Sequence, residues 1–227
     1  MVPWIANNAK RIFWVRHGEV INPGGPDRSV YYGALDVPLS KLGELEAQAA
    51  GDYLQQYALR RVFASPLQRA IYGGEQVWKR QSLQDSGVIQ LEGFKELDRG
   101  AWCGLTKEEI GPENLARFDA GDENVTPDGG ESYAALKQRV LEARDKALSL
   151  LEMEEAACVV SHLQVTRCVL SDALGIPTHE MAQIKVATAS ITCIDYTYNE
   201  DGMMTQVVHF QSFKPEAGLA QSKDGAN

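Results

Sequence analysis

The sequence predicts an α/β protein with three layers, in which helices cover both faces of a mostly parallel central sheet. Apolar runs of strand length lie at 12–15, 61–64 and 157–161, and segments with helical periodicity separate or follow them. The chain has 227 residues, of which 44% are hydrophobic and 23% charged, enough for a sizeable buried core. Polar residues follow each apolar run, so we expect a functional site at the carboxyl ends of these strands.

The first half of the chain alternates strands and helices. The strand at 12–15 leads into a loop rich in glycine and proline at 22–36. Ser40 is the predicted N-cap of a helix that extends to 54, with Glu44 in its first turn. The strand at 61–64 ends at Ser65-Pro66, and because proline is favoured in a first helical turn, a helix is predicted from 67 to about 80.

The second half continues the alternation and closes with a hairpin. A short strand is expected at 88–91, and Thr106-Lys107-Glu108-Glu109 is typical of a capped short helix. Apolar residues at helical spacing predict a helix from 131 to about 153. A helix at 165–174 should end at Gly175. The remaining segments are loops at 96–104 and 122–130 and the two hairpin strands at 190–198 and 205–210.

Length and charge limit the classes of function. We expect a single domain over 11–214, an N-terminal extension at 1–10 and a disordered polar tail at 215–227. No apolar run approaches the roughly 20 residues that span a bilayer, and the N-terminus lacks the apolar segment of a secretory signal. A cytoplasmic protein that acts without a membrane is therefore expected. The net charge of −9 argues against nucleic-acid binding, and a homodimer is left open.

The cysteines do not indicate a metal centre. Cys103, Cys158, Cys168 and Cys193 form no C-x-x-C pair, and no histidine lies at ligand spacing from them. We expect free thiols, no metal and no cofactor.

The tripeptide Arg16-His17-Gly18 is the first candidate for chemistry. It places a cation and a titratable imidazole directly after an apolar strand. His17 is thus a candidate nucleophile and Arg16 a candidate anion ligand, although a polar strand end with a turn glycine would give the same residues. Polar residues after the other strands, at Ser65-Pro66 and Ser161-His162, should lie at the same edge of the sheet.

Five segments, in order along the chain, resemble the motifs of the histidine phosphatase superfamily, the phosphoglycerate mutase-like group. They are Val15-Arg16-His17-Gly18-Glu19, which contains the RHG motif, Ser65-Pro66-Leu67-Gln68-Arg69-Ala70, Glu96-Leu97-Asp98-Arg99-Gly100-Ala101-Trp102-Cys103-Gly104, Gly129-Gly130-Glu131-Ser132 and Val159-Val160-Ser161-His162. Because the match covers most of the chain, the resemblance implies the phosphoglycerate mutase-like fold.

The resemblance also implies a role for each residue. His17 would accept the phosphoryl group and form a phosphohistidine. Arg16, Arg69 and His162 would surround the phosphoryl oxygens, and these two arginines and one histidine would supply the positive charge without a metal. Glu96 would donate a proton to the leaving oxygen and then activate water.

Two further substrate-binding positions are predicted with less support from the motifs. Asn22 lies near the place where the family often has an asparagine that contacts phosphate. Leu163-Gln164 stand where the family often has two glycines, and these larger residues would either narrow the phosphate pocket or change its polarity, with Leu163 as a predicted substrate-binding residue. Gly73-Gly74 stand in the helix after Arg69, where a glycine pair either loosens the helix or permits close packing.

The predicted activity is metal-independent hydrolysis of a small phosphorylated metabolite. The interval from Lys107 to Ser161 is short and acidic and lacks the basic insertion of the family's mutases. A mutase-type phosphotransferase remains an alternative, as does a weakly active regulatory or binding protein on the same fold. A nucleotide-binding protein is disfavoured because no G-x-G-x-x-G follows the first strand.

Overall fold

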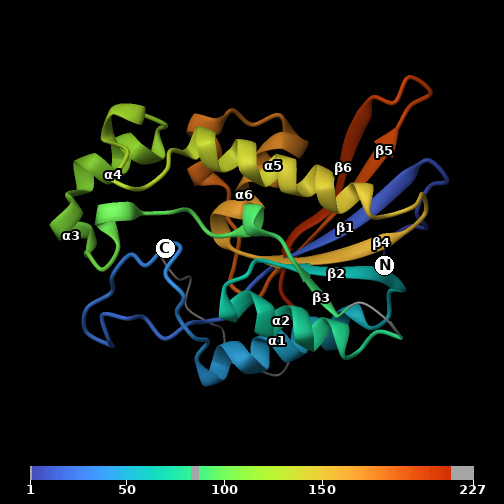
Figure 1. Cartoon of the computed structure of the whole chain (residues 1–227), viewed down its shortest axis with the longest axis horizontal. Coiled ribbons are helices and arrows are strands. Elements are labelled where there is room, and N and C mark those ends of the chain that lie inside the picture. Colours follow the sequence, from blue (N-terminus) through green and yellow to red (C-terminus); the bar gives the residue numbers. More distant parts are fainter. Residues whose placement is uncertain (1, 83–86, 216–227) are drawn as a thin grey trace.

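The central element is a six-stranded sheet in the order β3-β2-β4-β1-β5-β6 (Figure 1). This is a computed structural model, and it describes residues 2–82 and 87–215. The strands are β1 (Ala9–Arg16), β2 (Leu59–Ala64), β3 (Val88–Gln90), β4 (Ala156–Ser161), β5 (Ile191–Tyr198) and β6 (Met204–Phe213). The first four strands pair in parallel, and β5 and β6 add an antiparallel edge. The predicted mostly parallel sheet is confirmed.

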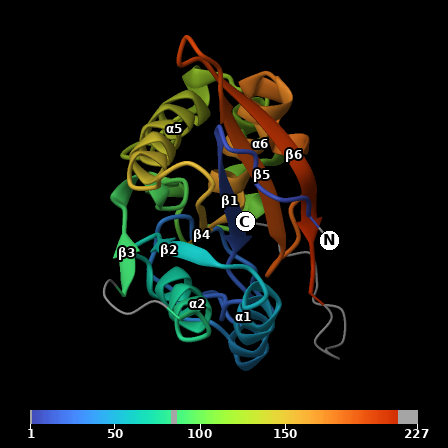
Figure 2. The same cartoon turned by 90° about the vertical axis from the view of Figure 1, so that its right-hand side faces the viewer.

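Helices cover both faces of this sheet, which confirms the three-layer prediction. They are α1 (Lys41–Leu54), α2 (Gln68–Trp78), α3 (Lys107–Ile110), α4 (Pro112–Asp119), α5 (Tyr133–Ser149) and α6 (Leu163–Leu174), with 3₁₀ turns at Glu92–Phe94, Gly100–Trp102, Glu123–Val125 and Thr178–Gln183. Figure 2 shows α1 and α2 together on one face and α5 and α6 on the other.

The sequence of β1 explains why both faces are covered. Ile12 and Trp14 point into the core cluster that includes residues of α5 and α6. Phe13 and Val15, which alternate with them, point into the cluster that includes residues of α1 and α2. A strand with four consecutive apolar residues, at 12–15, has no face for water over that stretch, so helices must lie on both sides.

The ends of the helices follow the predicted capping signals. The Ser40 side chain accepts a hydrogen bond from the backbone N–H of Gly43 at 3.1 Å. Thr106 and Glu109 form the expected capping box at the start of α3. Gly175 ends α6 in the left-handed conformation, with φ of 66°.

α4 and the four 3₁₀ turns named above were not predicted, and the helix predicted from 131 to about 153 is shorter. α4 and the 3₁₀ turn at Thr178–Gln183 lie in segments with few apolar residues. α5 begins after Ser132, whose side chain caps it, and ends at Ser149 rather than near Met153, because the last residues form a turn before β4.

The N-terminal end of the chain differs from the prediction. β1 begins at Ala9, inside the predicted N-terminal extension, and Val2 and Ile5 pack against the core. Of the predicted tail, residues 216–227 lie outside the described residues. Over the part of the chain that the structure describes, no helix has both the length and the hydropathy to cross a membrane.

Candidate active site

The polar residues after three parallel strands meet at one edge of the sheet. The backbone N–H of His17 donates to the carbonyl of Ser161 at 3.0 Å, which joins the end of β1 to the end of β4. The backbone N–H of Ser65 donates to the carbonyl of Val160 at 3.0 Å, which joins β2 to the same strand. The predicted convergence of these strand ends is therefore present in the fold.

The ring of His17 has one nitrogen engaged and one available. Its Nδ1 lies 2.7 Å from the carbonyl oxygen of Gly18, and because a carbonyl only accepts, Nδ1 carries the proton. Nε2 is buried and has no hydrogen-bond partner among the described residues. Burial lowers the pKa of His17 well below its usual value, and Arg69 and Arg16 lower it further. The side chain is therefore neutral at pH 7, with the lone pair on Nε2.

Gly18 is required at this position by the packing of α1. A Cβ on Gly18 would lie 2.5 Å from the carbonyl oxygen and 2.7 Å from Cα of Gly43. The absence of a side chain thus lets the turn after β1 lie against the first turn of α1. This contact fixes the carbonyl that orients the His17 ring.

His162 lies beside His17 and is also neutral. The centroids of the two rings are 5.1 Å apart, and the ring planes meet at 63°. Both ring nitrogens of His162 are buried without a hydrogen-bond partner in the described part of the chain. Burial lowers the pKa of His162 well below its usual value, and Arg69 and His17 lower it further. Burial therefore favours the uncharged form of this ring, and the role of His162 as a source of positive charge stays a prediction.

Backbone carbonyls hold the two predicted arginines. Arg69, in the first turn of α2, is fully buried and donates from Nη1 to Leu35 at 2.6 Å and from Nη2 to Gly33 at 2.8 Å. Its guanidinium also lies 5.4 Å from the ring centre of Tyr32. Arg16 donates from Nη1 to the carbonyl of Val186 at 2.6 Å. Carbonyl oxygens orient a guanidinium without neutralising its charge, so Arg69 remains able to attract an anion.

Glu96 lies at the N-terminus of α6, next to His162. Its side chain is buried, and Oε1 accepts hydrogen bonds from the backbone N–H of Leu97 at 2.8 Å and of Gln164 at 3.3 Å. Gln164 belongs to the first turn of α6, for which His162 is the N-cap. A carboxyl group is favoured at this end of a helix by the helix dipole. The structure thus brings together all five residues predicted as catalytic.

An ion pair between Arg139, on α5, and Glu131, just before that helix, holds the segment that carries Glu96. Arg139 donates to the carbonyls of Gly93 at 3.0 Å, Lys95 at 2.9 Å and Glu96 at 3.1 Å. Its guanidinium is paired with Glu131, from the Gly129-Gly130-Glu131-Ser132 motif. The motif therefore positions the candidate acid from outside the site.

The two further predicted substrate-binding residues have other contacts in this structure. The Asn22 amide accepts hydrogen bonds from the backbone N–H groups of Gly24 and Val30 and donates to the carbonyl of Val30, so it closes its own loop. Leu163 packs in the core cluster on the α5–α6 side of the sheet. Contacts of either residue with a substrate stay predictions.

Two arginines of the site were not assigned a chemical role from the sequence. Arg99 is buried, and its guanidinium lies 5.0 Å from the ring centre of Tyr31 and 5.3 Å from that of Phe118. Arg167, on α6, donates from Nε to the carbonyl of Ile184 at 2.8 Å. Arg167 lies one turn after Gln164 on the same helix. This spacing was the signal in the sequence from which a role for Arg167 could have been predicted.

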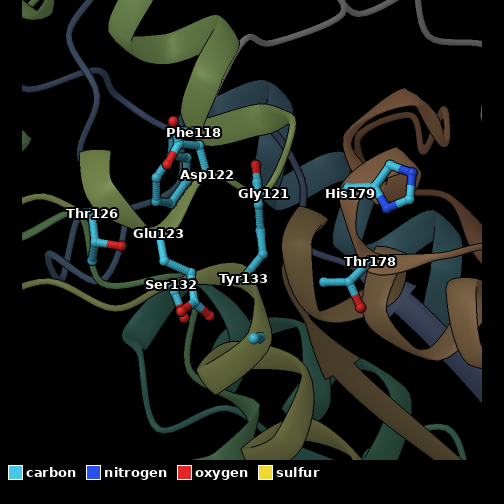
Figure 3. Close-up of a pocket in the computed structure, with 10 residues that line it drawn as sticks. Phe118, Gly121, Asp122, Glu123, Thr126, Ser132, Tyr133, Thr178 and His179 are labelled. Carbon is cyan, nitrogen blue, oxygen red and sulfur yellow. The ribbon is translucent and has the colours of Figure 1, made fainter.

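Figure 3 shows a separate cavity, with a volume of about 220 Å³. It is lined by Phe118, Gly121, Asp122, Glu123, Thr126, Ser132, Tyr133, Ala134, Thr178 and His179. None of the five predicted catalytic residues lines it. The cavity is therefore distinct from the edge of the sheet where those residues meet.

Comparison with known proteins adds family information to this geometry. The profile of the histidine phosphatase superfamily (branch 1) matches residues 12–207. The chain is 28% identical over 188 residues to phosphoserine phosphatase 1 of Hydrogenobacter thermophilus, covering 81% of this chain and 85% of that protein. It is 26% identical over 189 residues to "Probable phosphoglycerate mutase GpmB" of Yersinia enterocolitica, covering 82% of this chain and 85% of that protein.

Solved structures share the arrangement of elements. Mycobacterial glucosyl-3-phosphoglycerate phosphatase superposes with a TM-score of 0.75 at 23% identity, covering 90% of this chain and 99% of that one. The alpha-ribazole phosphatase of Shigella flexneri gives a TM-score of 0.72 at 21% identity, covering 90% and 96%. At these identities the likeness shows the fold and no more.

Proposed function

Because the chain belongs to the histidine phosphatase superfamily, we propose that it hydrolyses phosphate monoesters through a phosphohistidine formed on His17. The substrate is a small phosphorylated metabolite, and the reaction needs no metal ion. Phosphatases among the relatives, such as phosphoserine phosphatase 1, support the general class of reaction.

The observation that carries the proposal is the state of the His17 ring. A proton fixed on Nδ1 by the Gly18 carbonyl leaves the lone pair on Nε2, and the low pKa keeps that lone pair available at neutral pH. Arg16 and Arg69 supply two positive charges beside it. A neutral nucleophile is not repelled by the negative charge of a phosphoryl group, and the neighbouring cations attract that group. This arrangement is therefore suited to attack on phosphorus.

In the first step, the Nε2 lone pair attacks phosphorus and the bond between phosphorus and the ester oxygen breaks. Glu96, in its acid form, gives its proton to the leaving oxygen, and an alcohol departs. The phosphoryl group stays on Nε2, where its oxygens accept hydrogen bonds from Arg16, Arg69 and His162. His162 can donate from one ring nitrogen while it is neutral.

In the second step, a water molecule attacks the phosphoryl group from the side that the alcohol has left. Glu96, now a carboxylate, accepts a proton from this water as the bond between Nε2 and phosphorus breaks. Inorganic phosphate departs, and His17 and Glu96 return to their starting states.

The test uses His17→Ala with His179→Ala as a matched control, because the His179 side chain is 62% exposed and lies outside the cluster. With EDTA present, the wild type and the control should hydrolyse p-nitrophenyl phosphate, and His17→Ala should lose at least about 1,000-fold in kcat. Mass spectrometry of enzyme quenched in alkali should place a phosphoryl group on the peptide that contains His17. Retained activity in His17→Ala would overturn the mechanism.

The mutase alternative is kept because a relative carries the name of a phosphoglycerate mutase. With 3-phosphoglycerate as substrate, a hydrolase releases inorganic phosphate, whereas a mutase forms 2-phosphoglycerate and retains the phosphate in organic form. Analysis of the products by ³¹P NMR separates the two. Formation of 2-phosphoglycerate without phosphate release would replace hydrolysis by transfer.

A further inference from the structure

We propose that Ser212 and Lys214, at and just after the end of β6, are positioning residues for the tripeptide Arg16-His17-Gly18. This inference rests on the proposed phosphatase function and adds two residues that act on its site through other residues. Ser212 holds the loop that orients Arg16, and Lys214 holds the turn that orients the His17 ring. The end of the edge strand β6 thereby sets the geometry at the end of β1.

Loop 186–190, which precedes β5, contacts both the cation and the nucleophile of the tripeptide. The carbonyl of Val186 accepts the hydrogen bond from Nη1 of Arg16 at 2.6 Å. The backbone N–H of Ala189 donates to the carbonyl of His17 at 3.1 Å. A shift of this loop would therefore move the guanidinium relative to the site.

Ser212 binds this loop from β6. Its Oγ accepts a hydrogen bond at 2.8 Å from the backbone N–H of Ala187, the residue after Val186. Its own backbone N–H donates at 3.1 Å to Oγ1 of Thr192, a fully buried residue near the start of β5. Ser212 thus ties the loop that holds Arg16 to the central sheet.

The backbone around this contact departs from regular strand geometry. The register of β5 and β6 shifts between Ile191 and Cys193, where β6 carries an extra residue near Ser212. Bulges of this kind redirect a side chain and are common next to active sites. Ser212 and Ala189 also have φ of 53° and 54°, which residues other than glycine rarely adopt. Because such strain persists only where surrounding contacts enforce it, and is concentrated at functional sites, it supports a role for these contacts in the site.

Lys214 acts on the other flank of His17, through Glu46 of α1. Its Nζ lies 2.7 Å from Oε1 of Glu46, whose side chain is only 1% exposed. Oε2 of the same carboxylate accepts a hydrogen bond from the backbone N–H of Glu19 at 2.7 Å. A Cβ on Gly18 would lie 3.0 Å from this oxygen, so the carboxylate lies against the turn after the nucleophile. Because the carbonyl of Gly18 orients the His17 ring, the ion pair also holds that ring.

The charge of Lys214 stabilises the buried carboxylate of Glu46 in this place. A buried carboxylate that loses its cation is unfavourable, and it moves toward water or takes up a proton. Either change weakens its hydrogen bond with the N–H of Glu19. Glu46→Gln removes the charge but still offers an oxygen to that N–H. The need for Lys214 should therefore disappear in a protein that carries Glu46→Gln.

The first test measures the affinity for inorganic phosphate by calorimetry. Ser212→Ala leaves the N–H of Ala187 without its acceptor and loosens the loop that holds Arg16, so phosphate should bind about tenfold more weakly than to the wild type. Asn199→Ala is the matched control, because Oδ1 of Asn199 accepts the backbone N–H of Met203 at 2.7 Å at the opposite end of the same hairpin. Its affinity should stay within about twofold of the wild type. An unchanged affinity in Ser212→Ala would overturn the role of Ser212.

The second test measures kcat for p-nitrophenyl phosphate. Lys214→Met should lower kcat about tenfold and leave the affinity for phosphate within about twofold of the wild type, because only the turn after His17 shifts. Adding Glu46→Gln should restore kcat to within about threefold of the wild type. Lys79→Met is the control, since Lys79 forms an exposed ion pair with Glu75, and its kcat should not change. An unchanged kcat in Lys214→Met, or one that Glu46→Gln does not restore, would overturn the role of Lys214.

These results separate positioning from stability and from the proposed function. If Lys214→Met does not fold, as judged by circular dichroism, Glu46→Ala replaces it with the same expected loss of kcat, because it also removes the hydrogen bond with Glu19. Residues that only stabilise the fold would leave phosphate affinity and kcat of the folded variants unchanged, which would overturn the proposal while the phosphatase function stands. If the wild type hydrolyses no ester, the phosphatase function fails, and the phosphate affinity of Ser212→Ala still decides the role of Ser212.

Discussion

Substituting Gly18 by alanine tests whether the packing of the turn after β1 orients the nucleophile. The added Cβ would lie 2.5 Å from the carbonyl oxygen of Gly43, and ordinary contact begins at 3.4 Å. The two backbone segments must therefore separate by about 0.9 Å. Since both partners are backbone atoms, no side chain can rotate to relieve the contact.

This displacement should affect stability and activity together. Overpacking of this kind destabilises by about 1–3 kcal/mol. The carbonyl of Gly18 holds Nδ1 of His17 at 2.7 Å, so moving it turns the ring that carries the lone pair. A misplacement near 1 Å lowers activity by about 100-fold. Urea unfolding followed by circular dichroism measures the first effect, and hydrolysis of p-nitrophenyl phosphate measures the second.

Gly202→Ala is the matched control for Gly18→Ala. Gly202 has φ of 77°, and no atom lies within 4 Å of an added Cβ. Alanine there is strained by roughly 1–2 kcal/mol, a stability loss similar to that of Gly18→Ala, but far from His17. The control should therefore keep its kcat/KM within about twofold of the wild type, because only its stability changes. If Gly18→Ala retained kcat/KM within threefold of the wild type, the proposed link between this glycine and the ring would be refuted.

Three more predictions concern pH, positioning and stability. Because burial and two nearby arginines lower the pKa of His17, the unfolded chain binds the proton first as pH falls below about 6.5. His17 alone should then decrease the free energy of unfolding by up to ~1.4 kcal/mol per pH unit. Urea unfolding from pH 7 to 5 should show a shallower slope for His17→Asn than for the wild type, and an identical slope would contradict this. Arg139→Gln should lower kcat about tenfold with a smaller change in KM, because the substitution releases the backbone carbonyl of Glu96. Steady-state kinetics measure both constants. A rise in KM alone would count against a positioning role for Arg139. Asp195→Asn should destabilise the protein by about 3–5 kcal/mol, because it leaves Arg11, whose side chain is 4% exposed, without its charged partner. Urea unfolding measures this change. A decrease in the free energy of unfolding of less than about 1 kcal/mol would be inconsistent with the prediction.

The location of the site could be predicted because it follows from strand direction. His17, Ser65 and His162 each come directly after an apolar run, and parallel strands bring such positions to one edge. The hydrogen bonds between the ends of β1, β2 and β4 show this arrangement. The motifs then supplied residues outside the strands, Arg69 and Glu96, which no periodicity in the sequence would have selected.

Other features depend on contacts that the sequence does not contain. α4 has only Leu115 and Phe118 buried, so its apolar pattern is too sparse to predict a helix. The glycine pair of α2 left two interpretations open, and the structure favours close packing, because a Cβ on Gly73 would lie 2.9 Å from Cγ1 of Val160. The neighbours of Arg99 are likewise set by tertiary packing, since Tyr31 and Phe118 are distant from it in sequence.

Arginines that can bind an anion differ from arginines that stabilise the fold in the groups that their side chains contact. Arg11 is paired bidentately with Asp195, at 2.6 and 2.8 Å, so its charge is neutralised within the sheet. Arg69 and Arg167 are instead oriented by backbone carbonyls, which fix the guanidinium while leaving its net charge in place. In a chain with a net charge of −9, carboxylates are abundant. Contacts with carbonyls instead of carboxylates at these positions preserve a local positive field that can attract an anion.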